Sequence, residues 1–467
     1  MPAKYSIHTK PAAPRVRHVG KLGIVDWRED CSSCHNCVKR DCVYGLYRDE
    51  ADTLRDEIGY LDYIYQCKGC LNCIQNCTKG ILTRVVNPEF KRLGDEYYTP
   101  DIILATWFQS ESGRIPVSGS GYGGPFSGPG FDSMWTDMSE IVRPTRDGIH
   151  GREYINTSVD IGRKLQHLAF HDGQLAVAPL PLVEIPMPVI FDIIPEHWQR
   201  GPVLPAALRA AAELGTLAVV RQKDITAELA GEQSHVIPLL DDDSVGRSST
   251  ASMLMLPDGD KVMAAVAALK QQNPDQIVAI RIPATPAVAA RAVELTRAGA
   301  EVLHLLFDAH GRESGTDQPR HVRDVLRDVH GSLVKDGSRD QVTLVSSGGI
   351  AQAEHVAKAI ICGADLVAID LPLLIAMECR LCRECEHGRP CVIALDDLEL
   401  DYAAHRAVNL MGAWHQQLIE VLGAMGIREV RRLRGETGRA MFFEDLERDS
   451  FGRLFGKRKE GVGYASA

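Results

Sequence analysis

The chain has 467 residues, of which 45% are hydrophobic and 24% are charged, and its formal net charge is -10 at pH 7. A globular chain of this length buries a large core and divides into two or three structural units. The negative balance argues against a nucleic-acid surface, because such a surface needs clustered Lys and Arg to neutralise phosphates.

The N-terminal extension, residues 1–27, lacks the apolar run of a secretory signal. The two most apolar stretches, 178–195 and 366–377, are interrupted by proline and by acidic residues, so neither is expected to span a bilayer. The sequence therefore predicts a soluble, cytoplasmic protein without a transmembrane segment.

Eight of the thirteen cysteines fall into two similar runs. The first run is Cys31, Cys34, Cys37 and Cys42, and the second is Cys67, Cys70, Cys73 and Cys77. Disulfides are disfavoured in a cytosolic protein, and zinc fingers separate their cysteine pairs by a long loop. Four cysteines within eleven residues, spaced C-x2-C-x2-C-x3-C in the second run, are typical of ligands to a [4Fe-4S] cluster. Zinc or structural thiols are the alternative.

Residues 28–85 resemble a bacterial two-cluster ferredoxin domain, in which the fourth cysteine of each run binds the other cluster. The segment departs from that family at Thr78, where proline is usual. The resemblance implies two [4Fe-4S] clusters in one small folded unit.

The stretch from Gly128 to Lys164, "GPGFDSMWTDMSEIVRPTRDGIHGREYINTSVDIGRK", closely resembles the lead-in to the flavin barrel of archaeal-type glutamate synthases. It lies in a linking segment assigned to residues 86–175, and the resemblance continues more weakly to about Gly435. Arg146, His150 and Arg152 lie inside this stretch. Because the stretch precedes the barrel, a structural clasp between the barrel and the ferredoxin unit is favoured for them over catalysis.

Residues 176–435 alternate short β-branched runs with Ala-rich helical runs, which predicts an α/β fold with a parallel sheet. About eight strands are available, so a closed (β/α)8 TIM-like barrel is expected, with its site at the carboxyl ends of the strands. The expected strands are 188–191, 217–220, 236–240, 277–282, 302–307, 342–345 and 366–369, and the expected helices are 205–214, 261–270, 287–298, 322–329 and 353–361.

Three features of the expected rim concern a flavin. Gly348 and Gly349 leave room for backbone N–H groups to approach a phosphate, although a glycine pair is also an ordinary turn. Arg281 lies where the resembled enzymes carry a lysine beside the flavin ring, and it would either stabilise a reduced flavin or close a salt bridge at the barrel mouth. Asp370 replaces a small uncharged residue of those enzymes, and it either repels the FMN phosphate or caps the next helix.

The chain also departs from the glutamate synthases in its rim loops. Their glycine-rich loops near flavin and 2-oxoglutarate are replaced by "FDIIPEHWQRGP" and "FDAHGRESGTDQP". His310 and Arg312 in the second loop are the candidate catalytic residues, with a solvated loop as the alternative. A glutaminase segment is absent from the sequence, so ammonia derived from glutamine is expected to come from another polypeptide.

A third cysteine run, Cys379, Cys382, Cys385 and Cys391, follows the last expected strand and its helix. The resembled enzymes hold a [3Fe-4S] cluster there with three cysteines, spaced as Cys379, Cys385 and Cys391 are. Cys382 supplies a fourth ligand for a [4Fe-4S] cluster. A helix is expected at 405–425, packed on the barrel, and residues 436–467 are assigned to a C-terminal tail.

These features predict an iron–sulfur oxidoreductase subunit that resembles the synthase subunit of glutamate synthase and relays electrons within a multi-subunit complex. The expected partners are glutaminase-like subunits or subunits that oxidise NAD(P)H or ferredoxin. Two alternatives stay open: an FMN-dependent enzyme that reduces 2-iminoglutarate, and a barrel that has lost its chemistry and serves as a scaffold. A zinc-stabilised binding protein is a weaker third alternative.

Overall fold

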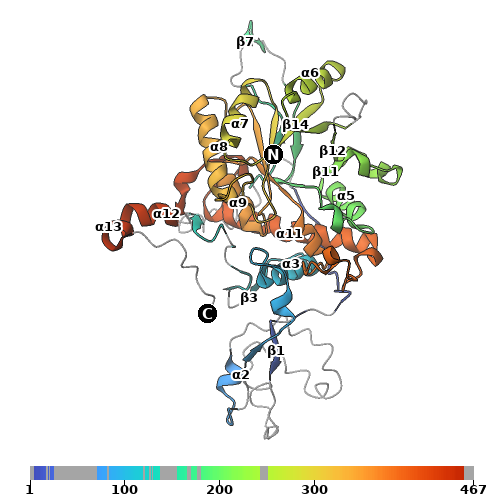
Figure 1. Cartoon of the computed structure of the whole chain (residues 1–467), viewed down its shortest axis with the longest axis vertical. Helices are drawn as coiled ribbons and strands as arrows, with labels where there is room; N and C mark the ends of the chain where they lie inside the picture. The colour runs from blue at the N-terminus through green and yellow to red at the C-terminus, as the bar shows by residue number, and fades with distance from the viewer. Residues whose placement is uncertain are drawn as a thin grey trace.

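The computed structural model describes residues 5–16, 19, 21–25, 71–80, 84–118, 121–125, 128, 130–136, 155–165, 170–175, 180–241 and 251–456. Within these residues the chain forms a closed barrel of eight parallel strands, with helices on its outside (Figure 1). The predicted (β/α)8 barrel is therefore confirmed.

The barrel strands are short runs of buried apolar residues, each paired in parallel with its neighbours. They are β10 (Val189–Phe191), β11 (Ala218–Arg221), β12 (Val236–Leu239), β13 (Met253–Pro257), β14 (Ile277–Pro283), β15 (Val302–Leu306), β16 (Thr343–Ser347) and β17 (Leu366–Ile369). The barrel closes where β10 pairs with β17, with Val189 opposite Val367 and Phe191 opposite Ile369. β13 is absent from the seven strands that the sequence predicted, because its Met and Leu residues lack the β-branching typical of strands.

Helices cover the outside of the barrel between most successive strands, as right-handed crossover connections require. They are α5 (Val203–Leu214), α6 (Val262–Gln272), α7 (Val288–Arg297), α8 (Val322–Asp336), α9 (Ala353–Ile361) and α10 (Leu371–Ala376). After β11 the connection is made by two 3-10 turns, η6 (Gln222–Asp224) and η7 (Ala227–His235).

A long helix, α11 (Leu400–Ala424), packs across α5 and α9 and contacts α3 (Pro100–Ser112). The two helices are joined by buried polar contacts: Trp414 Nε1 donates to Gln109 Oε1 at 3.2 Å, and Asn409 Nδ2 donates to the Ser110 carbonyl at 2.9 Å. The predicted helix on the barrel is confirmed, although it begins at Leu400 rather than at 405. Through α3 and α11 the lead-in segment is fixed to the barrel.

The amino-terminal end of the barrel is closed by the antiparallel pair β6 (Val159–Ile161) and β9 (Val183–Ile185). The Thr343 hydroxyl, at the start of β16, donates to the Gly162 carbonyl at 2.8 Å and accepts from the Gly162 N–H at 3.2 Å. Between β6 and β9 the hairpin of β7 (Phe170–His171) and β8 (Gln174–Leu175) projects from the body (Figure 1). The carboxyl ends of the strands lie at the opposite end of the barrel.

The unit at the bottom of Figure 1 contains β1 (Leu22–Val25), β2 (Arg84–Val86) and the short helix α2 (Asn72–Gln75). β1 and β2 pair antiparallel and bracket residues 26–83, which hold both N-terminal cysteine runs. The predicted domain boundaries at 28 and 85 stay predictions, because most of this segment lies outside the described residues. A small hairpin of β3 (Val117–Ser118) and β4 (Gly121–Tyr122) follows α3.

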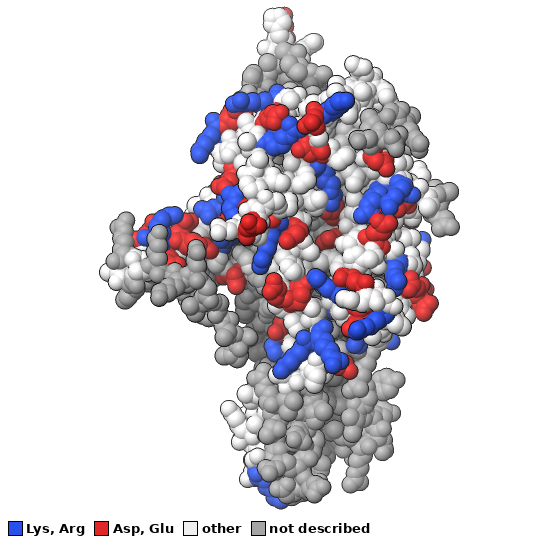
Figure 2. Space-filling model, viewed as in Figure 1, with Lys and Arg blue, Asp and Glu red and all other residues white. Residues whose placement is uncertain are grey.

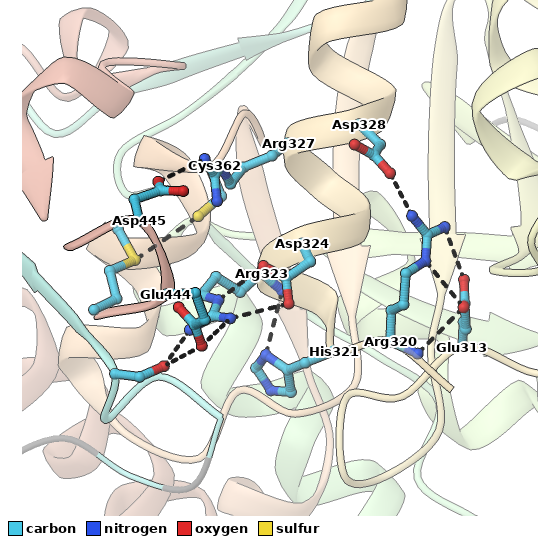
Figure 3. Close-up of polar contacts among 12 residues, drawn as sticks. Glu313, Arg320, His321, Arg323, Asp324, Arg327, Asp328, Cys362, Glu444 and Asp445 are labelled. Carbon is cyan, nitrogen blue, oxygen red and sulfur yellow. Dashed lines mark hydrogen bonds and ion pairs between the residues drawn. The ribbon is translucent and has the colours of Figure 1, made fainter. Parts of the chain in front are cut away.

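The segment after residue 436, predicted as a tail, begins with elements that pack on the barrel unit. β18 (Ala440–Phe442) pairs antiparallel with β5 (Met134–Thr136) of the lead-in, and α12 (Phe443–Leu446), the π-helix η12 (Glu447–Phe451) and α13 (Gly452–Phe455) follow. Arg323 of α8 donates to Glu444 at 3.0 Å and to the Ser133 hydroxyl (Figure 3). One guanidinium therefore joins the barrel, the lead-in and the C-terminal segment.

The face of the molecule shown in Figure 2 carries blue and red side chains interspersed over the barrel. Many of the described charges are paired, for example Arg434 with Asp340 at 2.6 Å and Arg291 with Asp258 at 2.7 Å. Among the helices of the described residues, none has the length and apolarity needed to cross a membrane.

Candidate functional site

The third cysteine run lies directly after α10, at the carboxyl end of the last barrel strand. Cys379 is buried and the other three cysteines are partly buried. All four line one pocket, together with Trp198, Arg380, Arg383, Glu384, Val392, Ile393 and Leu395. The structure therefore brings together the four residues that the spacing predicted as ligands.

The loops around these cysteines use left-handed backbone conformations at residues other than glycine. Leu381 and Arg383, which separate Cys379, Cys382 and Cys385, have φ angles of 46° and 58°. A left-handed residue with a side chain costs roughly 1–2 kcal/mol, and such residues gather at functional sites. The run is therefore held in a shape that local preference alone does not favour.

The same turn occurs in the N-terminal cysteine run. Leu71, which follows Cys70, has φ 61° and ψ 7° and begins α2. Arg383, which follows Cys382, has φ 58° and ψ 10° and begins the 3-10 helix η8 (Glu384–His387). In both segments, which lie more than 300 residues apart in the sequence, the residue after a cysteine is thus left-handed and precedes a short helical turn.

The chemistry of the pocket favours a metal cluster over isolated thiols. Burial raises the pKa of Cys379 to about 12, and the neighbouring cysteines add to this, so an isolated thiol there stays protonated. Thiolate ligation needs a metal cation that offsets this penalty. Among the described residues, including this pocket, no three or more His, Cys, Asp or Glu side chains are arranged so that they could hold a single metal ion. In a cluster each thiolate binds its own iron, so four cysteines that line one pocket are compatible with a cluster.

A buried ion pair lies at the mouth of the barrel. Arg281, on β14, donates from both terminal nitrogens to Asp192, at 2.6 and 3.0 Å. Burial by itself raises the pKa of Asp192, but the charge and the hydrogen bonds of Arg281 outweigh it and hold this pKa well below its usual value. Of the two roles predicted for Arg281, the structure shows the salt bridge at the barrel mouth.

His304, on β15, lies beside this pair, with its Nε2 3.8 Å from Asp192 Oδ2. Burial, and then the charge of Arg281, lower the pKa of His304 to about 3, so the ring is neutral at pH 7. Sequence reasoning assigned no role to Asp192 or His304. The available signals were an aspartate directly after an apolar strand and a histidine inside the apolar run "VLHLLF".

Gly348 and Gly349 follow β16 and both have positive φ, at 93° and 72°. A Cβ on Gly348 would lie 2.4 Å from the Asp308 carbonyl oxygen, and one on Gly349 would lie 2.6 Å from the Gly311 Cα. The Gly349 carbonyl accepts a hydrogen bond from the Tyr97 hydroxyl at 2.7 Å. The glycine pair is therefore required by the packing of the loops after β15 and β16, whether or not a phosphate binds there.

Asp370 follows β17 and caps α10, accepting a hydrogen bond from the Leu371 N–H at 2.6 Å. Burial, and then the nearby charge of Asp192, raise its pKa to about 6. A carboxylate at this helix start occupies an amide donor and repels a phosphate. At this one position, therefore, the rim disfavours an FMN phosphate in the loops where such barrels hold it.

The two candidate catalytic residues lie in the loop after β15. His310 Nε2 is 3.0 Å from Asp95 Oδ2, and its ring stacks on Tyr97 with the centroids 5.4 Å apart. Arg312 holds the loop through its backbone, and its half-exposed side chain lies 4.0 Å from Glu96. Both residues thus lie against the lead-in segment, and the contacts found for their side chains join the loop after β15 to that segment.

The N-terminal cysteines fall partly inside and partly outside the described residues. Cys73 and Cys77 are partly buried on and beside α2. The remaining N-terminal cysteines and the lead-in residues Arg146, His150 and Arg152 lie outside the described residues; these cysteines are Cys31, Cys34, Cys37, Cys42, Cys67 and Cys70. Their roles stay predictions.

Comparison with known proteins places the chain among its relatives. Residues 245–428, from before β13 to beyond α11, match a conserved region in glutamate synthase. The archaeal glutamate synthase [NADPH] of Archaeoglobus fulgidus is 26% identical over 92% of this chain and 96% of its own length. The chain is a relative of the archaeal-type glutamate synthases.

Other members of that group give the same result. The archaeal-type glutamate synthase [NADPH] of Dehalococcoides mccartyi is 27% identical over 88% of this chain and 93% of its own length.

Among solved structures, a mandelate oxidase variant with (S)-mandelic acid has a TM-score of 0.40 at 16% identity, covering 64% of this chain and 97% of that one. A flavocytochrome b2 variant with pyruvate has a TM-score of 0.41 at 11% identity, covering 71% and 94%.

Proposed function

We propose that the chain is an iron–sulfur electron-transfer subunit of a glutamate synthase-like oxidoreductase. It relays electrons through two N-terminal [4Fe-4S] clusters and a third at Cys379, Cys382, Cys385 and Cys391. One observation carries the proposal: four cysteines far in sequence from the ferredoxin-like runs line a single pocket. The left-handed residue after Cys382 matches Leu71 within the second N-terminal run.

Iron–sulfur clusters accept and release single electrons, and their ligand loops set the reduction potential. In this chain Cys379 to Cys391 would hold the third cluster, with Arg380 and Arg383 supplying positive charge beside it. Cys382 gives this pocket a fourth thiolate, which favours a [4Fe-4S] cluster over the [3Fe-4S] type.

A second candidate function is FMN-dependent reduction of 2-iminoglutarate, with electrons from ferredoxin or NAD(P)H. Similarity to proteins named glutamate synthase, which extends over about nine tenths of the chain, favours this function. Against it, Arg281 is bound by Asp192, and Asp370 places a carboxylate at the expected phosphate position. We therefore place the barrel in the role of a scaffold that carries the third cluster and docks partner subunits.

The partners that this function needs are further subunits that oxidise NAD(P)H or ferredoxin, or that release ammonia from glutamine. A cytoplasmic location remains our prediction.

Anaerobically purified protein tests the proposal through its metal and flavin content. We expect about twelve irons per chain, from three clusters of four, and little FMN released on denaturation. Asp370→Gly is expected to raise FMN affinity, because it removes the carboxylate from the helix start. A colourless protein containing zinc contradicts the electron-transfer function, and about one FMN per chain in the native protein would replace the scaffold with the flavoenzyme.

A further inference from the structure

Arg383 stands between Cys382 and Cys385 and lines the cysteine pocket. Its Nε atom is buried and has no hydrogen-bond acceptor among the described residues, while its Nη2 donates to Asp95 Oδ2 at 2.8 Å. A buried donor that lacks an acceptor is unfavourable, because it has lost its hydrogen bond to water without a replacement. Arg383 thus has a buried N–H group for which the described protein groups supply no acceptor, on a residue that lines the pocket.

We propose that the Nε–H of Arg383 donates a hydrogen bond to a sulfur of the cluster in this pocket, and that Asp95 positions the guanidinium to do so. The inference rests on the proposed function, because the acceptor is the cluster held by the four cysteines. A hydrogen bond and a positive charge at the cluster sulfurs stabilise the reduced, more negative state, and so raise the reduction potential. Arg383 thus tunes the third cluster.

Asp95 is suited to a positioning role because each of its oxygens has a separate task. Oδ1 accepts from the N–H groups of Tyr97 and Tyr98, both at 2.8 Å, which fixes the carboxylate in its own turn. Oδ2 faces Arg383 at 2.8 Å and His310 at 3.0 Å. The carboxylate therefore cannot rotate away without breaking the turn, and Arg383 is held at a defined point of the pocket.

The same carboxylate connects the pocket to the barrel rim. His310 belongs to the loop after β15 and stacks on Tyr97, and the Tyr97 hydroxyl donates to Gly349 in the loop after β16. A displacement of either loop would move Asp95 and, through it, Arg383. In this proposal the potential of the third cluster depends on the loops after β15 and β16, through the contact of His310 with Asp95.

The test is a redox titration of the full-length, anaerobic protein followed by electron paramagnetic resonance. The signal of the third cluster is identified as the one lost in Cys385→Ser. We expect Arg383→Gln to shift its oxidised-to-reduced ratio about tenfold toward the oxidised form, which is about 59 mV for a one-electron couple. Arg389→Gln is the control, because it removes the same charge from the same run at an exposed residue that pairs with Glu384. The reduction potential of the third cluster in this variant is expected to match the wild type.

Asp95→Asn distinguishes a positioning role of Asp95 from a direct effect of its charge, because the two predict shifts of opposite sign in the reduction potential of the third cluster. Loss of a negative charge alone would raise the potential. The Asn side chain keeps an oxygen for the Tyr97 and Tyr98 amides but turns an NH2 group toward Arg383, which releases the guanidinium, so we expect a lower potential. The inference is overturned if Arg383→Gln leaves the reduction potential of the third cluster unchanged, or if Asp95→Asn raises it.

If Arg383→Gln loses the cluster, the sign of the shift in Asp95→Asn tests the inference alone. If no signal disappears in Cys385→Ser, the proposed function fails rather than this inference.

Discussion

Asp192 and Arg281 form an ion pair whose side chains are 4% and 12% exposed, at the mouth of the barrel. Removing one partner of a buried pair leaves an uncompensated charge and costs about 3–5 kcal/mol. We expect Asp192→Ala to lower the free energy of unfolding by about this amount, measured by urea denaturation of the barrel.

Asp340→Ala provides the matched control for this substitution. Asp340 also pairs with an arginine, Arg434, but its side chain is 78% exposed. An exposed pair contributes about 0–1 kcal/mol, so the control is expected to unfold almost as the wild type does. Equal effects of the two substitutions would contradict the claim that the barrel-mouth pair is buried and structural.

Asp370 makes the stability of the barrel depend on pH. Its pKa in the folded protein is about 6, above the ordinary value of 3.8. Between these values the unfolded chain ionises while the folded chain keeps its proton, so rising pH favours unfolding; above pH 6 the penalty is complete. Asp370→Asn keeps an acceptor for the Leu371 N–H and removes this penalty.

The expected result is that Asp370→Asn exceeds the wild type in unfolding free energy, by a margin that grows by about 1 kcal/mol between pH 5 and pH 8. Urea denaturation at several pH values measures it. A margin that does not change with pH would show that the pKa of the Asp370 carboxyl group is not raised in the folded protein. It would also remove the electrostatic argument against a phosphate at this position.

At the scale of elements, two arginines of α8 contact β18 and the helix that follows it, in addition to the pairing of β18 with β5. Arg323 binds Glu444, and Arg327 lies over the Phe442 ring with its guanidinium carbon 3.9 Å from the centroid. We expect Arg323→Ala to speed amide hydrogen exchange in residues 440–446 about tenfold, which corresponds to the loss of one to two kcal/mol of local stability.

Arg320→Ala is the control for that experiment, because Figure 3 shows Arg320 near the same helix start but paired with Glu313 and Asp328. These partners belong to the barrel, so exchange in residues 440–446 should stay at the wild-type rate. Equal acceleration in both variants would mean that the C-terminal segment is not fixed by Arg323.

The elements differ in how far the sequence predicts them. Most barrel strands follow from β-branched runs between Ala-rich helices, but β13, "MLMLP", carries no β-branched residue and was missed. The pairing of β5 with β18 joins residues about 300 positions apart, and no local pattern specifies it. In the site, cysteine spacing singled out four residues that the structure places around one pocket. The partner of Arg281, in contrast, lies 89 positions away and emerges only from the closed barrel.

At the scale of the whole molecule, β1 and β2 connect the N-terminal cysteine unit to the rest of the chain as one antiparallel pair. In the proposed function two clusters hold this small unit, and a unit with so little other core would need the metal to fold. We expect Cys70→Ser to remove the N-terminal cluster signals while the barrel keeps its unfolding transition. Retention of both signals would show that the ligands are assigned wrongly.

The central claim, that Cys379, Cys382, Cys385 and Cys391 hold a cluster, is tested most directly by the iron content of Cys385→Ser against the wild type, both purified without oxygen. We predict a fall from about twelve to about eight irons per chain, with the two N-terminal cluster signals intact. Equal iron content in the two proteins, or zinc in place of iron, would contradict the claim.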